Sequence, residues 1–311
     1  MDQSSPVSSV SLKIDVDTYE GMRDGVPRLL DSLARFDVKA TFCLSFGPDN
    51  SGKAIFKLFK DPQFLKKMLK TGAPKLYGWR TVLSGTLLPA RPIAISFPDI
   101  VRQIKSQGHE VIVHAWNHRL WQDRLPKMYS DEIMYEFKRA FKAYQAILGT
   151  KPHAVAAPGW QATPLSLRVQ DQLDLLYASD IREGPPCYLE ANGENYKTLQ
   201  IPTTGPCIEE LLTLGYRSDE EIMSKILEGI KNTDHPVVAI HAEVEGGIYN
   251  QLFQQKMLPT LIKRFKKVMT LKERYEQLTT SPLTIPRRRL CWIELPGRAG
   301  KIASSQSMPS N

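Results

Sequence analysis

The stretch VSLKIDVDT, residues 10–18, decides the fold of this chain. It begins as an apolar run of β character and ends in Asp15 and Asp17. Alternate side chains of a strand point the same way, so both carboxylates can face one pocket. Acidic groups at the carboxyl end of a buried strand are costly unless something compensates them, and a bound cation does so. The alternative is a turn-forming aspartate pair that caps the loop before Gly21.

Segments of β character alternate with amphipathic helical segments along the rest of the chain. This alternation is typical of βαβ units around a parallel sheet or barrel, so we predict an α/β fold. The predicted strands are 10–16, 39–46, 110–114, 153–157, 175–179, 198–201 and 236–241. The predicted helices begin near residues 26, 130, 165, 219 and 250, and the last of them extends to about 267. The helix at 130 is expected to end at Gly149.

The amino terminus has neither the basic start nor the apolar run of a secretory signal, and we expect no export. Every apolar run is shorter than the roughly 18 to 20 residues that a spanning helix requires, so we expect no membrane crossing. The four cysteines lie far apart and form no CxxC pair, which fits a reduced compartment.

The formal charge of +8 predicts a surface that attracts polyanions, either nucleic acid or anionic lipid. Much of the excess lies toward the carboxyl end, in Lys263, Arg264, Lys266, Lys267, Arg287, Arg288, Arg289, Arg298 and Lys301. Residues 54–97 form a basic amphipathic excursion with interleaved aromatics, the kind of segment that lies in a membrane interface. An ordinary helix packed on the barrel is the alternative. Because no nucleic-acid recognition module is visible, we expect no nucleic-acid partner.

The histidines supply candidate ligands. His114 and His118 stand four residues apart directly after a predicted strand, and they can present two imidazoles to one ion if the chain turns helical there. One of the two aspartates could complete a metal site, while the other takes a proton from water. His241 follows the apolar run 236–240 and could protonate a leaving nitrogen. A satisfied core histidine is the alternative at that position.

Together these features resemble the NodB-type polysaccharide deacetylase family over residues 10 to 245. The resemblance rests on the aspartate pair, the HxxxH motif, the Pro158-Gly-Trp160 loop and the Ile240-His241 pair. Further segments, among them residues 39–42, 47–52 and 76–80, are similar to the branch of the family that removes a formyl group from an amino sugar on a lipid phosphate.

The resemblance implies a distorted (β/α) barrel and a single divalent metal ion. It implies Asp17, His114 and His118 as metal ligands, Asp15 as general base and His241 as general acid. Two imidazoles and a carboxylate suit zinc, manganese, cobalt or nickel. The two acids are separated by one residue, whereas many members have adjacent acids, so the roles of base and ligand could be exchanged. Many members also carry an arginine where this chain has Ala156, which leaves the orientation of Asp15 unexplained; Asp180 is a candidate.

The implied substrate is undecaprenyl-phosphate-linked 4-deoxy-4-formamido-L-arabinose, at the cytoplasmic face of the bacterial inner membrane. The implied contacts with the sugar and phosphate come from Trp160, Trp116, Tyr77, Arg80 and Arg182. Deacetylation of an acetylated amino sugar, and a non-catalytic membrane-binding protein with a degenerate metal site, are the competing hypotheses. We expect an extension over residues 1–9, a catalytic domain over 10–280 with an insertion at about 54–97, and a basic, disordered tail over 281–311.

Overall fold

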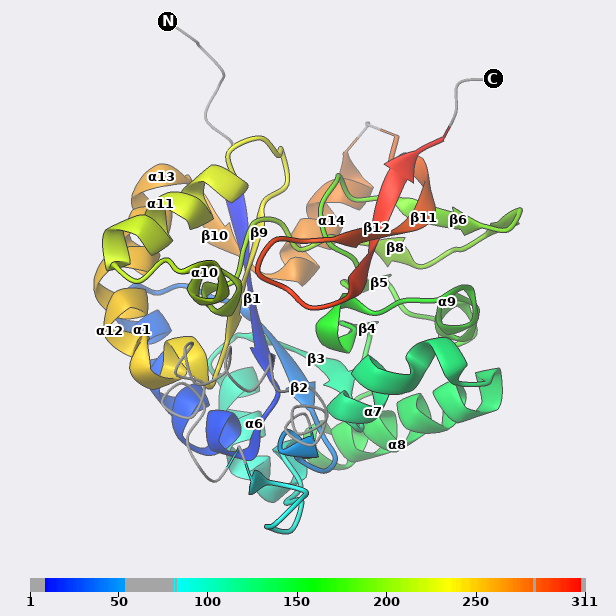
Figure 1. Ribbon diagram of the computed structural model, residues 1–311, viewed down its shortest axis with the longest axis horizontal. Coiled ribbons are helices and arrows are strands. Elements are labelled where there is room, and N and C mark those ends of the chain that lie inside the picture. Colours follow the sequence, from blue (N-terminus) through cyan, green and yellow to red (C-terminus); the bar gives the residue numbers. More distant parts are fainter. Residues whose placement is uncertain (1–8, 54–80, 82, 282–283, 309–311) are drawn as a thin grey trace, which may run out of the picture.

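A parallel sheet forms the centre of the protein. The structure is a computed structural model that describes residues 9–53, 81, 83–281 and 284–308. Among these residues, eight strands pair in the order β10-β1-β2-β3-β4-β5-β8, and β9 also pairs with β1. Their bounds are β1 (Ser9–Val16), β2 (Thr41–Ser45), β3 (Glu110–Ala115), β4 (Ala154–Val155), β5 (Tyr177–Ala178), β8 (Leu199–Gln200), β9 (Val237–His241) and β10 (Lys267–Met269). The predicted distorted (β/α) barrel is confirmed as a curled parallel sheet with helices around it (Figure 1).

Strand β1 is the central element of this sheet. Every one of its residues is buried. One side pairs with β2, while the other side pairs first with β10 and then, from Ser11 to Asp15, with β9. Because all of these pairings are parallel, the carboxyl ends of β1, β2, β3 and β9 lie at one edge of the sheet. Asp15, His114 and His241 therefore meet at that edge, which we call the catalytic edge.

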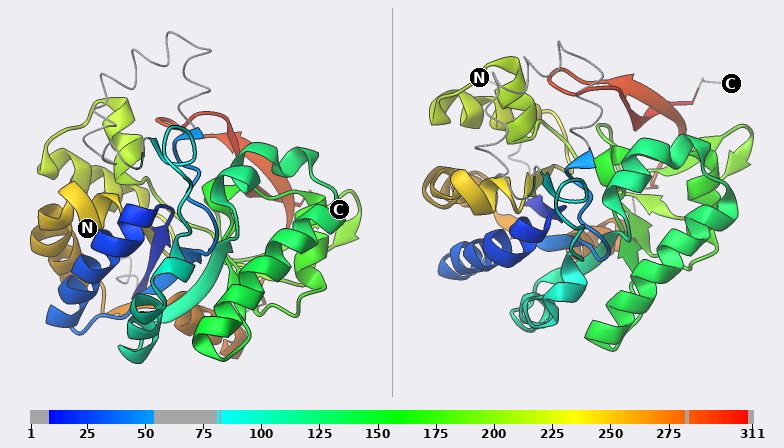
Figure 2. Two further views of the ribbon diagram at one scale, coloured as in Figure 1. Left: turned by 90° about the horizontal axis from the view of Figure 1, so that it is seen from below. Right: turned by 60° about the horizontal axis from the view of Figure 1, so that its bottom comes forward.

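Helices cover the outside of the sheet (Figure 2). They are α1 (Val26–Arg35), α6 (Pro98–Ser106), α7 (His118–Arg124), α8 (Ser130–Leu148), α9 (Pro164–Asp171), α10 (Ile208–Leu214), α11 (Asp219–Gly229), α12 (Asn250–Leu252), α13 (Leu258–Arg264) and α14 (Leu271–Thr280). Helix α8 ends at Gly149 as predicted, with the left-handed φ of 73° that glycine accepts at low cost. In the described part of the chain, no helix is long and apolar enough to cross a membrane.

The prediction of a disordered carboxyl-terminal tail was wrong. β11 (Arg287–Glu294) and β12 (Lys301–Ser307) form a hairpin that joins β6 (Tyr188–Ala191) and β7 (Glu194–Asn195) in a second, four-stranded sheet. The hairpin buries Leu290 and the run 302–305, whereas Arg287 and Arg289 are exposed. The polar composition suggested disorder, but part of it is buried in the hairpin: Ser304 and Ser305 are 4% and 8% exposed. The hairpin lies over the same side of the molecule as β4 and β5 (Figure 1).

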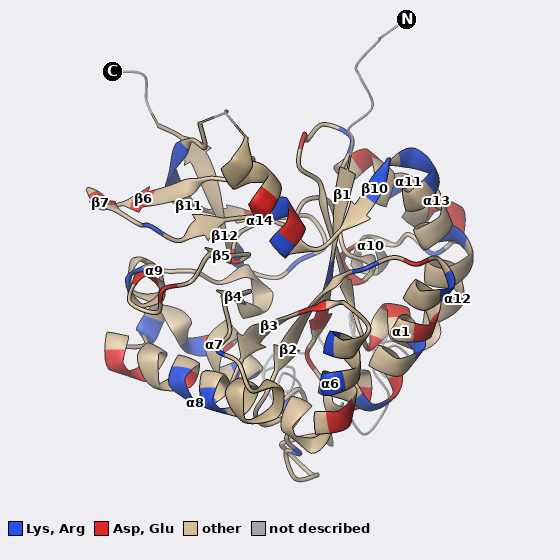
Figure 3. Ribbon diagram, turned by 180° about the vertical axis from the view of Figure 1, so that it is seen from behind, with Lys and Arg blue, Asp and Glu red and all other residues tan. Residues whose placement is uncertain are grey.

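The predicted helix over 250–267 also ends early. It stops at Arg264, and Lys267–Met269 forms strand β10, which pairs with Ser9–Ser11. The basic run 263–267 therefore lies beside the amino end of β1, at the edge of the sheet opposite the catalytic one. Seen from behind, Lys and Arg are interspersed with Asp and Glu over the helices, so the surplus positive charge does not gather in one patch on this face (Figure 3).

Candidate metal centre

The two histidines of the HxxxH motif come from different elements, as the sequence predicted. His114 is the second-to-last residue of β3, and His118 is the first residue of α7. Asn117 starts the helix because its side chain accepts a hydrogen bond from the backbone N–H of Leu120. The chain thus turns helical as it leaves the strand, which brings the second imidazole back over the first. The ring centroids are 5.2 Å apart.

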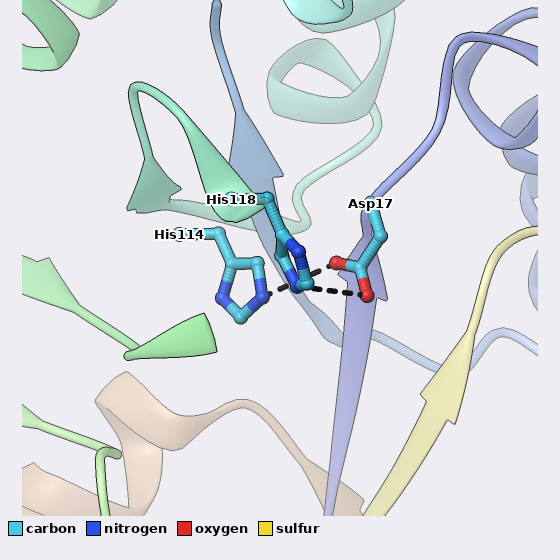
Figure 4. Close-up of side chains that lie close together, drawn as sticks. All are labelled: Asp17, His114 and His118. Atoms are coloured by element: carbon cyan, nitrogen blue, oxygen red, sulfur yellow. Dashed lines mark ion pairs between the residues drawn. The ribbon is translucent and has the colours of Figure 1, made fainter. Parts of the chain in front are cut away.

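Asp17 completes this group. It follows β1, and its carboxylate oxygens lie 3.2 Å from Nε2 of His114 and 3.2 Å from Nε2 of His118 (Figure 4). One ligand atom of each residue lies within 4.8 Å of the other two, which is the arrangement that a single cation can bridge. Burial opposes the charge on Asp17, but attraction to the two imidazoles outweighs it, and the pKa of Asp17 falls well below its usual range.

A second observation supports a metal at this position. Nδ1 of His114 lies 2.7 Å from the carbonyl oxygen of Ala156, so this nitrogen carries the proton and donates the bond. Nε2 is the ring atom that faces Asp17, and in the neutral ring it carries the lone pair that a metal ligand requires. The residues present therefore fit a divalent cation.

Asp15 has a different partner. Its Oδ2 lies 3.1 Å from Nζ of Lys13, and both side chains are almost fully buried. Burial disfavours the charge on Asp15, but Lys13 in the first place and then the nearby imidazoles outweigh it, and the pKa of Asp15 is lowered. Its other oxygen, Oδ1, is buried and has no hydrogen-bond partner among the described residues. Asp15 is thus an ionised carboxylate with a free oxygen.

Lys13 orients Asp15, the role that an arginine at the position of Ala156 was expected to have. Residues 13 and 15 point to the same face of β1, so the lysine reaches the carboxylate from its own strand. Asp180, the candidate named from the sequence, does not contact Asp15. It is fully buried, and it accepts hydrogen bonds from the backbone N–H of Ala157 and from the side chain of Gln170. It therefore holds the start of the Pro158–Trp160 turn.

His241 lies beside Asp15 on the neighbouring strand, because the two residues are register partners in β9 and β1. Its Nδ1 is 2.9 Å from Oε1 of Glu209, which belongs to α10. Burial disfavours the imidazolium, but Glu209 outweighs this effect and raises the pKa of His241 well above its usual value. Glu245 accepts a hydrogen bond from the backbone N–H of His241. Burial and the nearby Glu209 raise the pKa of Glu245 to about 8.

The indole ring of Trp160 packs edge-to-face against the imidazole of His241. The two rings are perpendicular, with centroids 6.4 Å apart, and the indole nitrogen donates to Oγ1 of Thr203. Only 2% of Trp160 is exposed, so it supports the site from beneath. Arg182 is 1% exposed; it stacks on this indole and forms an ion pair with Glu210. The prediction that Arg182 holds a substrate phosphate is therefore wrong, since its guanidinium is already paired and out of reach of solvent.

The remaining predicted contacts divide into two kinds. Trp116 is half-buried, its ring lies under the guanidinium of Arg139 at 4.2 Å, and its backbone carbonyl accepts a hydrogen bond from Gly47. Tyr77 and Arg80 lie outside the described residues. Lys13 and Glu209 were missed as site residues. An isolated lysine in an apolar strand, two positions before an aspartate, was a signal for the first, whereas no pattern in the sequence links Glu209 to His241.

The geometry predicts that the two aspartates respond differently to the same substitution. Asp17→Asn should weaken binding of Zn²⁺ or Co²⁺ at least tenfold, because it removes the charge between the two imidazoles. Asp15→Asn should leave the metal content unchanged. The measurement is metal content by elemental analysis after loading and dialysis, with circular dichroism to confirm folding. Equal metal loss in both variants would contradict this assignment.

The chain is similar to known proteins of one family. The model of the polysaccharide deacetylase family matches residues 2–178. Two relatives are each named as a probable 4-deoxy-4-formamido-L-arabinose-phosphoundecaprenol deformylase. The one from Shewanella sediminis is 33% identical over 97% of this chain and 96% of its own length, and the one from Wigglesworthia glossinidia brevipalpis is 29% identical over 93% and 99%.

Solved structures show the same fold. A polysaccharide deacetylase structure from Mycobacterium smegmatis, itself described as putative, has a TM-score of 0.62 at 16% identity and covers 92% of this chain and 94% of its own. A family 4 acetyl xylan esterase from Clostridium thermocellum, solved with a cobalt ion, has a TM-score of 0.52 at 17% identity and covers 88% and 93%. From the family match and the 33% identical relative together, the chain belongs to the polysaccharide deacetylase family.

Proposed function

We propose that the protein hydrolyses the formamide of 4-deoxy-4-formamido-L-arabinose carried on undecaprenyl phosphate, releasing formate and the free amino sugar lipid. The observation that carries the proposal is the juxtaposition of Asp15 and His241 on neighbouring strands beside the Asp17–His114–His118 group. The substrate is inferred from the two relatives named as deformylases. The liberated amine would be positively charged, and its transfer to lipid A would lower the negative charge that attracts cationic antimicrobial peptides.

A divalent cation held by Asp17, His114 and His118 would polarise the formyl oxygen and stabilise the negative charge that develops on it. Asp15 acts as the general base, because its Oδ1 has no hydrogen-bond partner in the described part of the chain and Lys13 keeps it ionised. It takes a proton from the attacking water, whose oxygen forms the new bond to the formyl carbon. Asp17 is assigned as a metal ligand instead, because each of its oxygens faces the Nε2 atom of one imidazole.

His241 serves as the general acid. Glu209 raises its pKa, so the imidazole carries a proton at neutral pH and can give it to the sugar nitrogen as the C–N bond breaks. The two catalytic groups are therefore tuned in opposite directions: Lys13 keeps the carboxylate unprotonated, and Glu209 keeps the histidine protonated. Such opposed tuning is the arrangement that assigns base and acid in other hydrolytic sites.

The choice of acyl group depends on the space beside the metal centre. Formyl lacks the methyl group of acetyl, and a narrow pocket around Trp160 and Trp116 would exclude the larger group. The competing function is removal of acetyl from an acetylated amino sugar, which uses the same acid and base. A non-catalytic binding role fits poorly with a buried, ionised Asp15 that has a free oxygen.

A lipid-linked substrate requires the catalytic edge to approach a membrane. Large apolar side chains are exposed there: Leu87 (78%) follows β2 in the chain, in a segment that packs on the turn after that strand, and Ile248 (60%) follows β9. We propose that these residues enter the interface of the cytoplasmic face of the inner membrane, with the protein bound peripherally. Most of the predicted amphipathic segment lies outside the described residues. The basic run 263–267 is at the opposite edge of the sheet and cannot face the same bilayer.

The direct test is incubation of metal-loaded protein with the formylated lipid-linked sugar. We expect stoichiometric formate and free amine, and no more than about one tenth of that kcat/KM on the acetylated analogue, since steric rejection of one extra methyl is worth about 1–3 kcal/mol. Formate is measured by an enzyme-coupled assay and the lipid product by mass spectrometry. Equal rates on both analogues would contradict the narrow pocket, and acetate release alone would establish the competing function.

The His241–Glu209 pair predicts a pH dependence. As pH rises through the raised pKa of His241, the general acid loses its proton and kcat/KM falls. Glu209→Gln removes the negative charge that holds the proton, so the fall should begin at lower pH. The control is Glu220→Gln, since Glu220 pairs with Lys256 on the surface. An alkaline limb that stays in place in Glu209→Gln would show that His241 is not the acid that the profile reports.

The membrane proposal predicts a difference between two edges of the sheet. Replacing Leu87 and Ile248 by Ser should weaken sedimentation with vesicles of anionic phospholipid about tenfold or more, because each leucine-sized side chain transfers about 1.5–3 kcal/mol of apolar burial. The matched control is Leu176→Ser, which is 40% exposed but precedes β5 at the opposite edge. Equal binding by the wild type and the double variant would rule out this contact surface.

A further inference from the structure

The loop between β11 and β12 reaches the rim of the candidate site. Gly297 has a left-handed φ of 81°, and a Cβ there would overlap the backbone carbonyl of Glu210 in α10. This close approach holds the next residue, Arg298, over the indole of Trp160, with its guanidinium carbon 4.5 Å from the ring centroid. Trp160 in turn contacts His241. A single aromatic ring therefore separates Arg298 from the proposed general acid.

Two arginines meet on the indole of Trp160. Arg182 and Arg298 both stack on this indole at 4.5 Å, and both form an ion pair with the same carboxylate oxygen of Glu210, at 3.0 Å and 3.3 Å. The guanidinium of Arg182 donates hydrogen bonds to both carboxylate oxygens of Glu210 and to the carbonyl oxygen of Gly205. The guanidinium of Arg298 has one hydrogen bond among the described residues, that to Glu210. Arg182 has a second carboxylate beside it, because Glu183 lies 3.9 Å from its guanidinium.

Exposure distinguishes the two arginines. The side chain of Arg182 is 1% exposed, whereas that of Arg298 is 18% exposed. The guanidinium of Arg298 is therefore partly open to solvent, and its N–H groups that have no partner among the described residues are available to a ligand. A guanidinium with free donors, fixed in place by an aromatic ring, matches the oxygens of a phosphate diester in both charge and geometry.

We propose that Arg298 binds the anionic phosphodiester that joins the sugar to its lipid carrier, and so selects lipid-linked sugars over neutral glycosides. The inference rests on the proposed function, since it assigns the phosphate contact of that substrate. It places the phosphate at the carboxyl-terminal hairpin, on the far side of Trp160 from the metal centre. The formamide and the phosphodiester are at opposite ends of the sugar, and the two contacts would fix its orientation.

The alternative is a purely structural role, in which Arg298 only anchors the hairpin to α10 through Glu210. The two roles differ in which substrates lose activity when Arg298 is replaced. An anchor affects all substrates alike, because its loss disturbs Trp160 and His241. A phosphate contact affects only substrates that carry the phosphate.

The test compares two water-soluble substrates, which removes any contribution from membrane binding. One is the formamido sugar on a short-chain prenyl phosphate, and the other is its neutral methyl glycoside. Arg298→Gln should raise KM for the phosphorylated substrate about tenfold or more with little change in kcat, and should leave the methyl glycoside unaffected. Arg298→Lys should retain part of the affinity. The matched control is Arg288→Gln, since Arg288 belongs to the same hairpin but donates to Ser305 and Ser307.

Each other outcome decides against the inference. An equal loss on both substrates, or a lowered melting temperature in Arg298→Gln together with loss in Arg298→Lys, would establish the structural role. An unchanged KM for the phosphorylated substrate would show that the phosphate binds elsewhere, while formate release by the wild type would leave the proposed function standing. If the wild type released formate from neither substrate, the proposed function and this inference would fail together.

Discussion

The site depends on keeping two carboxylates ionised at the buried end of β1. Taking a charge out of water costs several kcal/mol unless partners replace the lost hydration. Asp15 obtains its partner within its own strand, from Lys13, and Asp17 obtains its partners from the two imidazoles of the HxxxH motif. The sheet order follows from the same need, because only parallel strands bring the end of β3 to the end of β1.

The buried Lys13 changes how this chain achieves what other members of its family are expected to do with an arginine. An arginine after a different strand would connect two elements of the sheet, whereas Lys13 keeps the base and its counter-charge on one strand. Ala156, at the position where many family members are expected to have the arginine, accepts a hydrogen bond from Nδ1 of His114 through its backbone carbonyl. Asp180 is left to hold Ala157, and through it the turn that places Trp160 under His241.

The parts of the site that follow a local pattern could be predicted from the sequence. Asp17 follows Asp15 by two residues at the end of one strand, and His118 follows His114 by four residues where a strand gives way to a helix, so spacing alone brings each pair together. Glu209 reaches His241 from another helix, and Arg298 arrives from a hairpin whose polar residues suggested disorder; both depend on tertiary packing that no local pattern encodes. Arg182 was misassigned for the same reason, since burial decides whether an arginine meets a ligand or a neighbouring carboxylate.

The register of β1 and β9 has a mechanical consequence. Asp15 and His241 are direct partners on two hydrogen-bonded strands, whose axes in any such ladder stand about 4.8 Å apart. The separation of their Cα atoms is therefore set by the backbone of the sheet. A substrate that enters can rotate the two side chains but cannot move the two Cα atoms together or apart without breaking the ladder. Any gating of the reaction has to come from the loops that surround this fixed pair, and tolerance for a different acyl group would have to evolve in those loops while the acid and base remained in place.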